Sequence, residues 1–178
     1  MHYIKTAIFL FTLTILVSCK PASTGEVKAC FLKDFLDKEV ELLSQNNKRL
    51  QKAIYYQGEM HDTTITEPLW KEEMELFYVN LPDSQELTTK YKLSPDTSGN
   101  RYREQFVKID KDKSLKTIEL IYIDGKIISI RMNEKNIDNL SAQEMSINYN
   151  TQKSISSSGN FSLLNGEKKE YEIFGEIK

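Results

Sequence analysis

The side chains best suited to chemistry in this sequence are two cysteines, Cys19 and Cys30, and two histidines, His2 and His61. Two thiols in an oxidising compartment could pair as a disulfide, whereas acylation of one thiol leaves the other alone. A zinc site needs several histidine or cysteine ligands close together, and the sequence has no such cluster. We therefore predict that the chain binds no metal, and the fate of Cys19 becomes the main question.

The segment that precedes Cys19 predicts export from the cytoplasm. A short head with one firm positive charge, Lys5, is followed by an apolar run from Ala7 to Val17. As a helix this run would span about 16 Å, well short of a hydrocarbon core of about 30 Å. A charged head, a short apolar middle and a small residue such as Ser18 are typical of a signal peptide rather than of a membrane span.

The residues Leu16-Val17-Ser18-Cys19 resemble a lipobox, the motif that is cleaved in bacterial lipoproteins. The resemblance covers residues 1–19 and implies cleavage between Ser18 and Cys19, acylation of the Cys19 sulfur, and a lipid bilayer as partner. Two or more acyl chains anchor a protein stably. In such lipoproteins an aspartate after the cysteine favours the inner membrane. Because Lys20 follows here, without a later acidic run, the expected location is the periplasmic leaflet of the outer membrane.

The mature part of the chain is also similar to small lipoproteins of Bacteroidota, a resemblance that implies no function. It rests on Phe35, Glu39, Leu43 and the segment from Trp70 to Phe77.

Removal of residues 1–18 leaves 160 residues, enough for one domain with a core of its own. The leader holds one of the 24 basic residues and none of the 26 acidic ones, so the mature chain has a formal charge of −3. This near-balance argues against a nucleic acid partner. We expect residues 19–28 to form a flexible tether and residues 29–178 to form a single domain. Cys30 is interpreted as a small residue at the start of its first helix.

The mature chain offers little for catalysis, and we predict no catalytic residue and no cofactor. His61 lies in a polar stretch and is expected in a solvated loop. Residues Asp110–Ser114 look like the start of a calcium loop, but Leu115 and Ile121 stand where glycine and glutamate are required. An enzyme of this sequence would need a cleft in which His61 or a buried carboxylate meets other polar groups.

Two helices are predicted before any strand. The first begins near Cys30 and carries an apolar stripe of Leu32, Leu36, Val40, Leu43, Leu50 and Ile54. Its end is open: residues 53–57 either continue the helix or pair as a strand with residues 63–65 across Gly58. The second helix is capped by Thr66, carries Trp70, Met74, Phe77, Tyr78 and Leu81 on one face, and stops at Pro82.

After Pro82 the pattern changes to strands separated by turn residues. The expected strands cover residues 102–109, 115–123, 126–132, 145–149 and 169–177, with weaker signals at 90–93 and 161–164. Serines 154 and 156–158 are interpreted as a loop or a strand edge. The predicted fold class is α+β, with two N-terminal helices packed on a curved antiparallel sheet of about six or seven strands.

The hairpin at Asp124-Gly125 is the most informative local feature. A two-residue turn would pair Ile121 with Ile128 and Ile123 with Lys126, and would place Tyr122 opposite Ile127. Both faces of the sheet would then be apolar here, and the helices can cover only one of them. We take four residues as candidates for an apolar ligand or partner face: Ile118, Leu120, Tyr122 and Ile127.

Three functions remain open at this point. The favoured one is a non-catalytic envelope lipoprotein that binds an apolar ligand or an envelope protein, with an architecture similar to half-barrel lipid carriers. The second is a structural subunit of an envelope complex, which would expose a large apolar patch. The third is an enzyme of an unrecognised kind.

Overall fold

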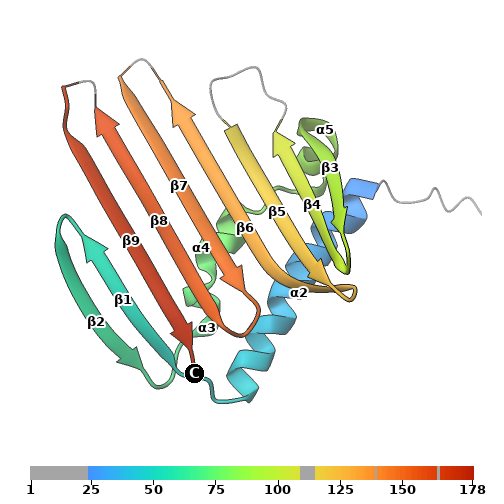
Figure 1. Cartoon of the computed structure of the whole chain (residues 1–178), viewed down its shortest axis with the longest axis horizontal. Helices are drawn as coiled ribbons and strands as arrows, with labels where there is room; N and C mark the ends of the chain where they lie inside the picture. The colour runs from blue at the N-terminus through green and yellow to red at the C-terminus, as the bar shows by residue number, and fades with distance from the viewer. Residues whose placement is uncertain (1–23, 109–114, 139, 164) are drawn as a thin grey trace, which may run out of the picture.

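The computed structural model describes residues 24–108, 115–138, 140–163 and 165–178. Its centre is one antiparallel sheet of nine strands in the order β2-β1-β9-β8-β7-β6-β5-β4-β3 (Figure 1). The strands are β1 (Leu50–Tyr56), β2 (Glu59–Ile65), β3 (Tyr91–Ser98), β4 (Arg101–Lys108), β5 (Leu115–Ile123), β6 (Lys126–Ile137), β7 (Ser141–Asn150), β8 (Ser154–Leu163) and β9 (Lys168–Ile177). The helices are α2 (Thr24–Gln45), α3 (Trp70–Glu73), α4 (Glu75–Asn80) and α5 (Ser84–Lys90).

The predicted fold class is wrong. The protein is mostly β, with nine strands in one sheet, and three of the four helices in the described part of the chain are only one or two turns long. The two uncounted strands are β1 and β2, which form a hairpin beside the C-terminal strand β9. The serine patch is not a loop, because it belongs to β8, which pairs with β7 and β9 on its two sides.

The first helix ends before the last two residues of its predicted apolar stripe, Leu50 and Ile54. It begins at Thr24, inside the segment 19–28 expected as a tether, and ends at Gln45. Asn47 then takes a left-handed backbone conformation with φ of 48°, which asparagine tolerates better than most residues and which stops a helix. Leu50 and Ile54 therefore belong to β1, so residues 53–56 form a strand rather than a continued helix. The predicted partner was wrong, because residues 53–56 pair with residues 59–62, and residues 63–65 pair with residues 50–52. A turn at Gln57-Gly58, both with positive φ, joins β1 to β2.

The second predicted helix is two short ones, α3 and α4, interrupted at Met74. Thr66 does not cap them, since Leu69 occupies the cap position and makes no side-chain hydrogen bond there. Lys52 of β1 holds this segment to the sheet through an ion pair of 2.6 Å with Glu73. The Tyr78 hydroxyl donates a 2.8 Å hydrogen bond to Asp37, which joins α4 to α2.

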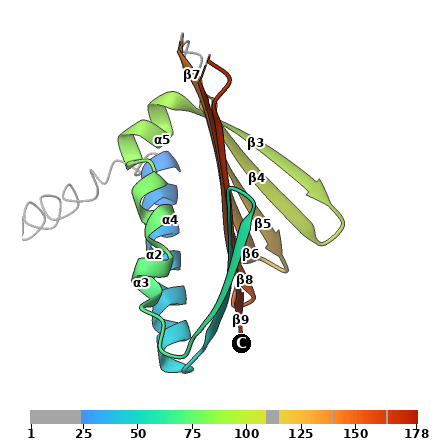
Figure 2. The ribbon, with the colours of Figure 1, turned by 90° about the vertical axis from the view of Figure 1, so that its left-hand side faces the viewer.

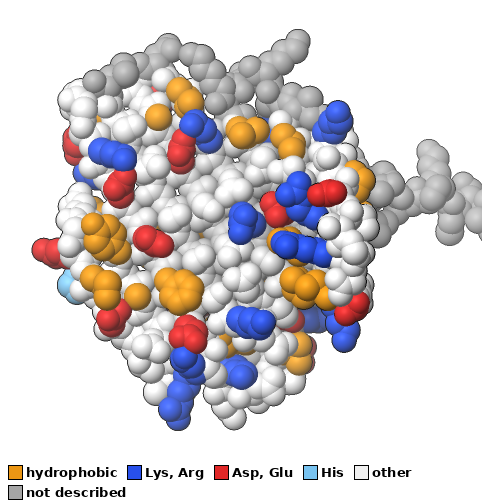
Figure 3. Space-filling view, viewed as in Figure 1, with side chains coloured by type: hydrophobic (Ala, Val, Ile, Leu, Met, Phe, Trp, Pro, Cys, Tyr) orange, Lys and Arg blue, Asp and Glu red, His pale blue; other side chains and the backbone are white. Residues whose placement is uncertain are grey.

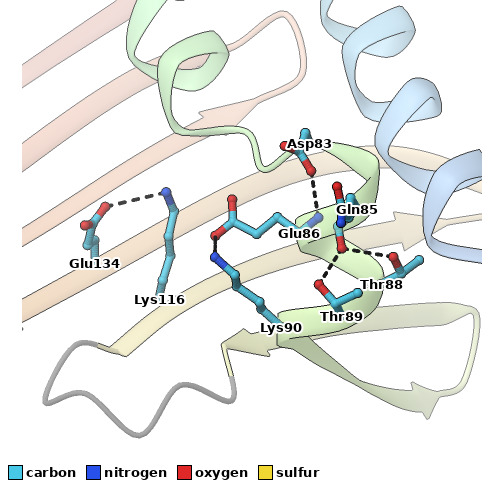
Figure 4. Close-up of polar contacts among 8 residues, drawn as sticks. All are labelled: Asp83, Gln85, Glu86, Thr88, Thr89, Lys90, Lys116 and Glu134. Carbon is cyan, nitrogen blue, oxygen red and sulfur yellow. Dashed lines mark hydrogen bonds and ion pairs between the residues drawn. The ribbon is translucent and has the colours of Figure 1, made fainter.

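A third helical segment, α5, was not predicted. Asp83 caps it by accepting a 2.6 Å hydrogen bond from the backbone N–H of Glu86 (Figure 4). Lys90 at the end of α5 lies 4.0 Å from Glu86, and Lys116 of β5 lies 3.6 Å from Glu134. Burial raises the pKa of the Tyr91 hydroxyl above its usual range, and the Glu86 and Glu134 carboxylates raise it further. One of these ion pairs thus lies within α5 and the other joins β5 to β6, and the Tyr91 hydroxyl experiences charges from both.

The four described helices, α2 to α5, lie on one side of the sheet (Figure 2). We call this side the covered face and the opposite side the open face. The core lies between the covered face and the helices, and its fully buried members come from both: Leu32, Leu36, Leu43, Leu50, Met74, Phe77, Ile118, Leu120, Ile130, Met132, Ile147 and Tyr149. This core is therefore formed without side chains from the open face.

The hairpin at Asp124-Gly125 forms as a two-residue turn, with Ile123 opposite Lys126 and Tyr122 opposite Ile127. The predicted pairing of Ile121 is wrong, because Ile121 pairs with Ser129. Ile128 is the extra residue of a β-bulge in β6, a device that shifts the register by one position. The bulge puts Ser129 on the open face and limits the apolar character expected there.

The sheet has two edges, β2 and β3. Strand β3 carries Pro95, and proline lacks the backbone N–H that a further strand would use. Strand β2 has no proline, and six of its seven residues are exposed. The two edges therefore differ in how well they are protected.

Candidate functional site

The four apolar residues singled out in the sequence do not line a free surface. Ile118, Leu120 and Ile127 are 0%, 1% and 6% exposed and belong to the core under the helices. Tyr122 packs against that core, and its hydroxyl donates a 3.1 Å hydrogen bond to Glu104. A ligand could reach these side chains only if the helical layer were displaced.

Two carboxylates are buried among the residues whose burial the structure describes, and tyrosines donate hydrogen bonds to both of them. Glu39 of α2 accepts a 2.5 Å hydrogen bond from the hydroxyl of Tyr149. Glu104 of β4 accepts hydrogen bonds from Tyr102 and Tyr122, each of 3.1 Å. Burial raises the pKa of the Tyr122 hydroxyl above its usual range, and the charge of Glu104 and the hydrogen bond to it raise this pKa further. Both acids thus act as hydrogen-bond acceptors that tie elements together.

His61 lies on the edge strand β2, with its side chain 70% exposed and 3.7 Å from Glu59. It meets neither of the two buried acids in any pocket found among the described residues. No group of three or more histidine, cysteine or acidic residues in the described ranges is arranged to hold a metal ion. Within the same ranges, every helix is too short or too polar to cross a membrane. Ser18, Cys19 and the segment Asp110–Ser114 lie outside the described residues.

A groove of about 500 Å³ crosses the open face. Two neighbouring rows of side chains, running across the strands, form its walls. One row consists of Lys135, Glu144, Asn160 and Glu170, and the other of Asn133, Ser146, Ser158, Glu172 and Tyr55. Leu115 of β5 closes the side near β6. The groove therefore takes residues from β5, β6, β7, β8, β9 and β1, which are neighbours in the sheet but not in the sequence.

The floor between the rows is formed by residues whose side chains point to the covered face. Gly159 is one of them, and a Cβ atom there would lie 2.5 Å from the ring of Tyr171. The Tyr171 ring thus packs over the glycine on the covered side, as aromatic side chains often do beside a glycine in a sheet. Between the two rows the floor therefore presents backbone rather than side chains to the open face.

Short polar side chains in the groove are held by one another. Ser146 donates a 2.8 Å hydrogen bond to the amide oxygen of Asn133, which in turn donates through its nitrogen to Thr117 at 3.3 Å. Asn160 donates to Glu144 at 3.4 Å, and Lys135 forms an ion pair with the same carboxylate. These bonds, chiefly the one from Lys135, hold the pKa of the Glu144 carboxyl below its usual range. The side chains are consequently positioned before any ligand arrives.

The character of the open face changes across the sheet (Figure 3). Uncharged polar side chains and backbone occupy its middle, and basic side chains gather over β4 to β6. Hydrophobic side chains gather over β1, β2 and β9. We call this last group, Tyr55, Met60 and Phe174, the apolar patch; these residues are 43%, 67% and 47% exposed. Tyr55 belongs both to the patch and to the groove.

No protein-family model matches this chain, and comparisons with curated proteins and with solved structures find no match. The groove is the site that reasoning from the sequence missed. One signal for it was present, since Glu144, Ser146 and Asn148 alternate with buried residues along β7. The partners of these residues across the sheet were not foreseeable, because they depend on the register of five other strands.

Proposed function

We propose that this chain is an exported lipoprotein of the cell envelope that acts as a non-catalytic binding module, with the groove as its binding surface. The observation that carries the binding role is the separation of the two faces. The covered face supplies the core, whereas the groove is built on the open face from preordered polar side chains. Concave sites with a few positioned polar groups are the usual form of ligand sites.

The lipobox at Leu16–Cys19 supports the anchoring part of the proposal, and Lys20 supports the outer membrane and its periplasmic leaflet. Helix α2 begins at Thr24, only five residues after Cys19. A fully extended chain covers at most about 3.5 Å per residue, so Thr24 lies within about 18 Å of the acylated sulfur. An anchored domain would therefore sit close to the bilayer, and a ligand in the groove would be held near the membrane.

The anchor is tested by replacing Cys19 with serine. We expect Cys19→Ser to abolish incorporation of a labelled fatty acid and to leave the uncleaved precursor, because the acceptor sulfur is gone. The matched control is Cys30→Ser, which should retain both label and cleavage. The readouts are fatty-acid labelling in growing cells and electrophoretic mobility. A labelled Cys19→Ser product, or an unlabelled parent protein, contradicts the anchor.

The binding role is tested with a photo-crosslinking residue placed in the groove at Ser146. The control position is Ser94, on the open face of the edge strand β3 and outside the groove. Adducts formed in intact cells from position 146, and not from position 94, are the expected result. Their absence at both positions would overturn the binding role.

A structural subunit of an envelope complex is the second candidate, and the apolar patch favours it. Met60 lies on the unprotected edge strand β2 and is the most exposed residue of the apolar patch. Exposed apolar patches mark protein–protein contacts. In that case crosslinks would form from position 60 to a defined protein and not from position 146.

A further inference from the structure

The shape of the groove defines the form of its ligand, and this step rests on the proposed binding role. The groove extends over six adjacent strands, from Leu115 on β5 to Tyr55 on β1. Five strand spacings of about 4.8 Å give a length of about 24 Å. A groove this long and open to solvent fits an extended chain better than a compact molecule.

The chemistry of the groove defines the ligand class. Serine hydroxyls and asparagine amides each offer both a donor and an acceptor, and they occupy the middle of the groove as Asn133, Ser146 and Ser158. Hydroxyl groups of a ligand offer the same combination. A chain that carries many hydroxyls can therefore be bound by uncharged side chains in the middle of the groove.

Charged ligands fit less well. On the open face, three carboxylates (Glu144, Glu170 and Glu172) outnumber two ammonium groups, that of Lys135 in the wall and that of Lys168, which pairs with Glu170. A polyanion would be repelled by this excess of negative charge. A polycation would have to compete with ion pairs that already exist, Lys135 with Glu144 and Lys168 with Glu170.

Tyr55 provides a flat apolar surface at the end of these polar rows. Its side chain is 43% exposed, and it stands beside Glu172 in the pairing of β1 with β9. An aromatic ring next to a carboxylate can pack against the C–H face of a sugar ring while the carboxylate accepts hydrogen bonds from its hydroxyls. An extended peptide would need apolar pockets or a free strand edge, and neither lies in the middle of the groove.

We propose that the groove binds a neutral polyhydroxylated chain, that is, an oligosaccharide or a glycan strand of the envelope, with Tyr55 as the stacking residue. The asparagines and serines of the rows bind its hydroxyls, and Glu172 accepts from the sugar that stacks on Tyr55.

The test uses the purified lipidated protein in nanodiscs and a printed array of neutral and acidic oligosaccharides, followed by calorimetric titration with the best neutral ligand. We expect neutral oligosaccharides of several units to bind and acidic ones to bind less. Tyr55→Ala should weaken binding about tenfold, the equivalent of a strong aromatic contact, whereas Tyr55→Phe should stay within about threefold.

A second variant fills the groove without touching the core. Ser158→Ile puts a larger, branched side chain into one wall of the groove, where a strand tolerates it, and should abolish measurable binding. The same change at Ser94, outside the groove, should leave binding within about twofold. Thermal unfolding monitored by circular dichroism verifies that both variants fold.

The outcomes separate the two proposals. If no neutral oligosaccharide binds, or if Ser158→Ile binds like the parent, the glycan assignment is overturned. If crosslinked adducts still form from position 146 and prove to be peptides, only the ligand class fails. If position 146 also gives no adduct, the binding role fails with it.

Discussion

Replacing Tyr149 with phenylalanine should lower the free energy of unfolding by about 3 kcal/mol, although the change removes only one oxygen atom. That oxygen donates to the Glu39 carboxylate at 2.5 Å and accepts from the backbone N–H of Gln152 at 3.0 Å. Tyr149 is 0% exposed and Glu39 is 5% exposed, so no solvent replaces the lost partner. Urea unfolding of parent and variant at neutral pH measures the difference.

The control is the same substitution where the hydroxyl reaches solvent. Tyr56 is 49% exposed, and Tyr56→Phe should change the free energy by less than about 0.5 kcal/mol. In the double variant Glu39→Met with Tyr149→Phe, the buried charge is gone. The double variant should therefore lose less free energy of unfolding than the sum of the losses in the two single variants. Additive losses would show that the pair does not interact across the core.

The protein should lose stability steeply between about pH 10 and pH 12. Burial, reinforced by the hydrogen bond to Glu39, raises the pKa of the Tyr149 hydroxyl above its usual range, and burial is also the main cause of the raised pKa of Tyr78, Tyr91 and Tyr122. Below pH 10 these hydroxyls keep their protons in the folded and the unfolded chain, so their full contribution is present. Above pH 10 the unfolded chain ionises first, which removes about 1.4 kcal/mol per pH unit for each tyrosine that stays protonated in the folded chain.

The midpoint of urea unfolding, measured at several pH values, follows this loss, and tyrosinate absorbance reports the ionisation itself. Tyr149→Phe carries one raised hydroxyl fewer, and its slope above pH 10 should be smaller than that of the parent by about 1.4 kcal/mol per pH unit. A parent protein equally stable at pH 8 and pH 11 would contradict the effect of burial on these hydroxyls.

Strands with strong local signals could be predicted from the sequence. The strand at residues 115–123 has the predicted bounds, and the turn at Asp124-Gly125 forms as predicted. Both depend on residues close together in the chain. The bulge at Ile128 did not follow from the sequence, because a bulge and a regular pair differ only in the geometry of the two strands together.

Two local features of the sequence explain the errors in fold class. Leu50 and Ile54 continue the helical spacing of α2, and only the left-handed turn at Asn47 assigns them to a strand. The serines of β8 lack the apolar alternation that marks a strand, since Gly159 and serines occupy positions on both faces. An interior strand can be this polar when its surroundings leave room only for small residues. In β8 the ring of Tyr171 packs against Gly159 on the covered face, and Ser158 lines the groove on the open face.

The groove itself was beyond prediction from one sequence. Its residues are as far apart as Tyr55 and Glu172, and they meet because the β1–β2 hairpin adds to the sheet beside β9. No local pattern encodes that addition. The four apolar candidates could be recognised from the sequence, but their role was misassigned. Ile118 and its neighbours form or contact the core rather than a ligand surface.

The unequal edges of the sheet limit how copies of this protein could associate. Pro95 obstructs backbone pairing at β3, so a strand from another molecule can add only along β2. Two molecules joined there through a twofold axis would turn their proline-bearing strands outward. Such a pair would present only its two β3 edges to further strands, so strand addition alone would stop at two molecules and would not extend into a fibril.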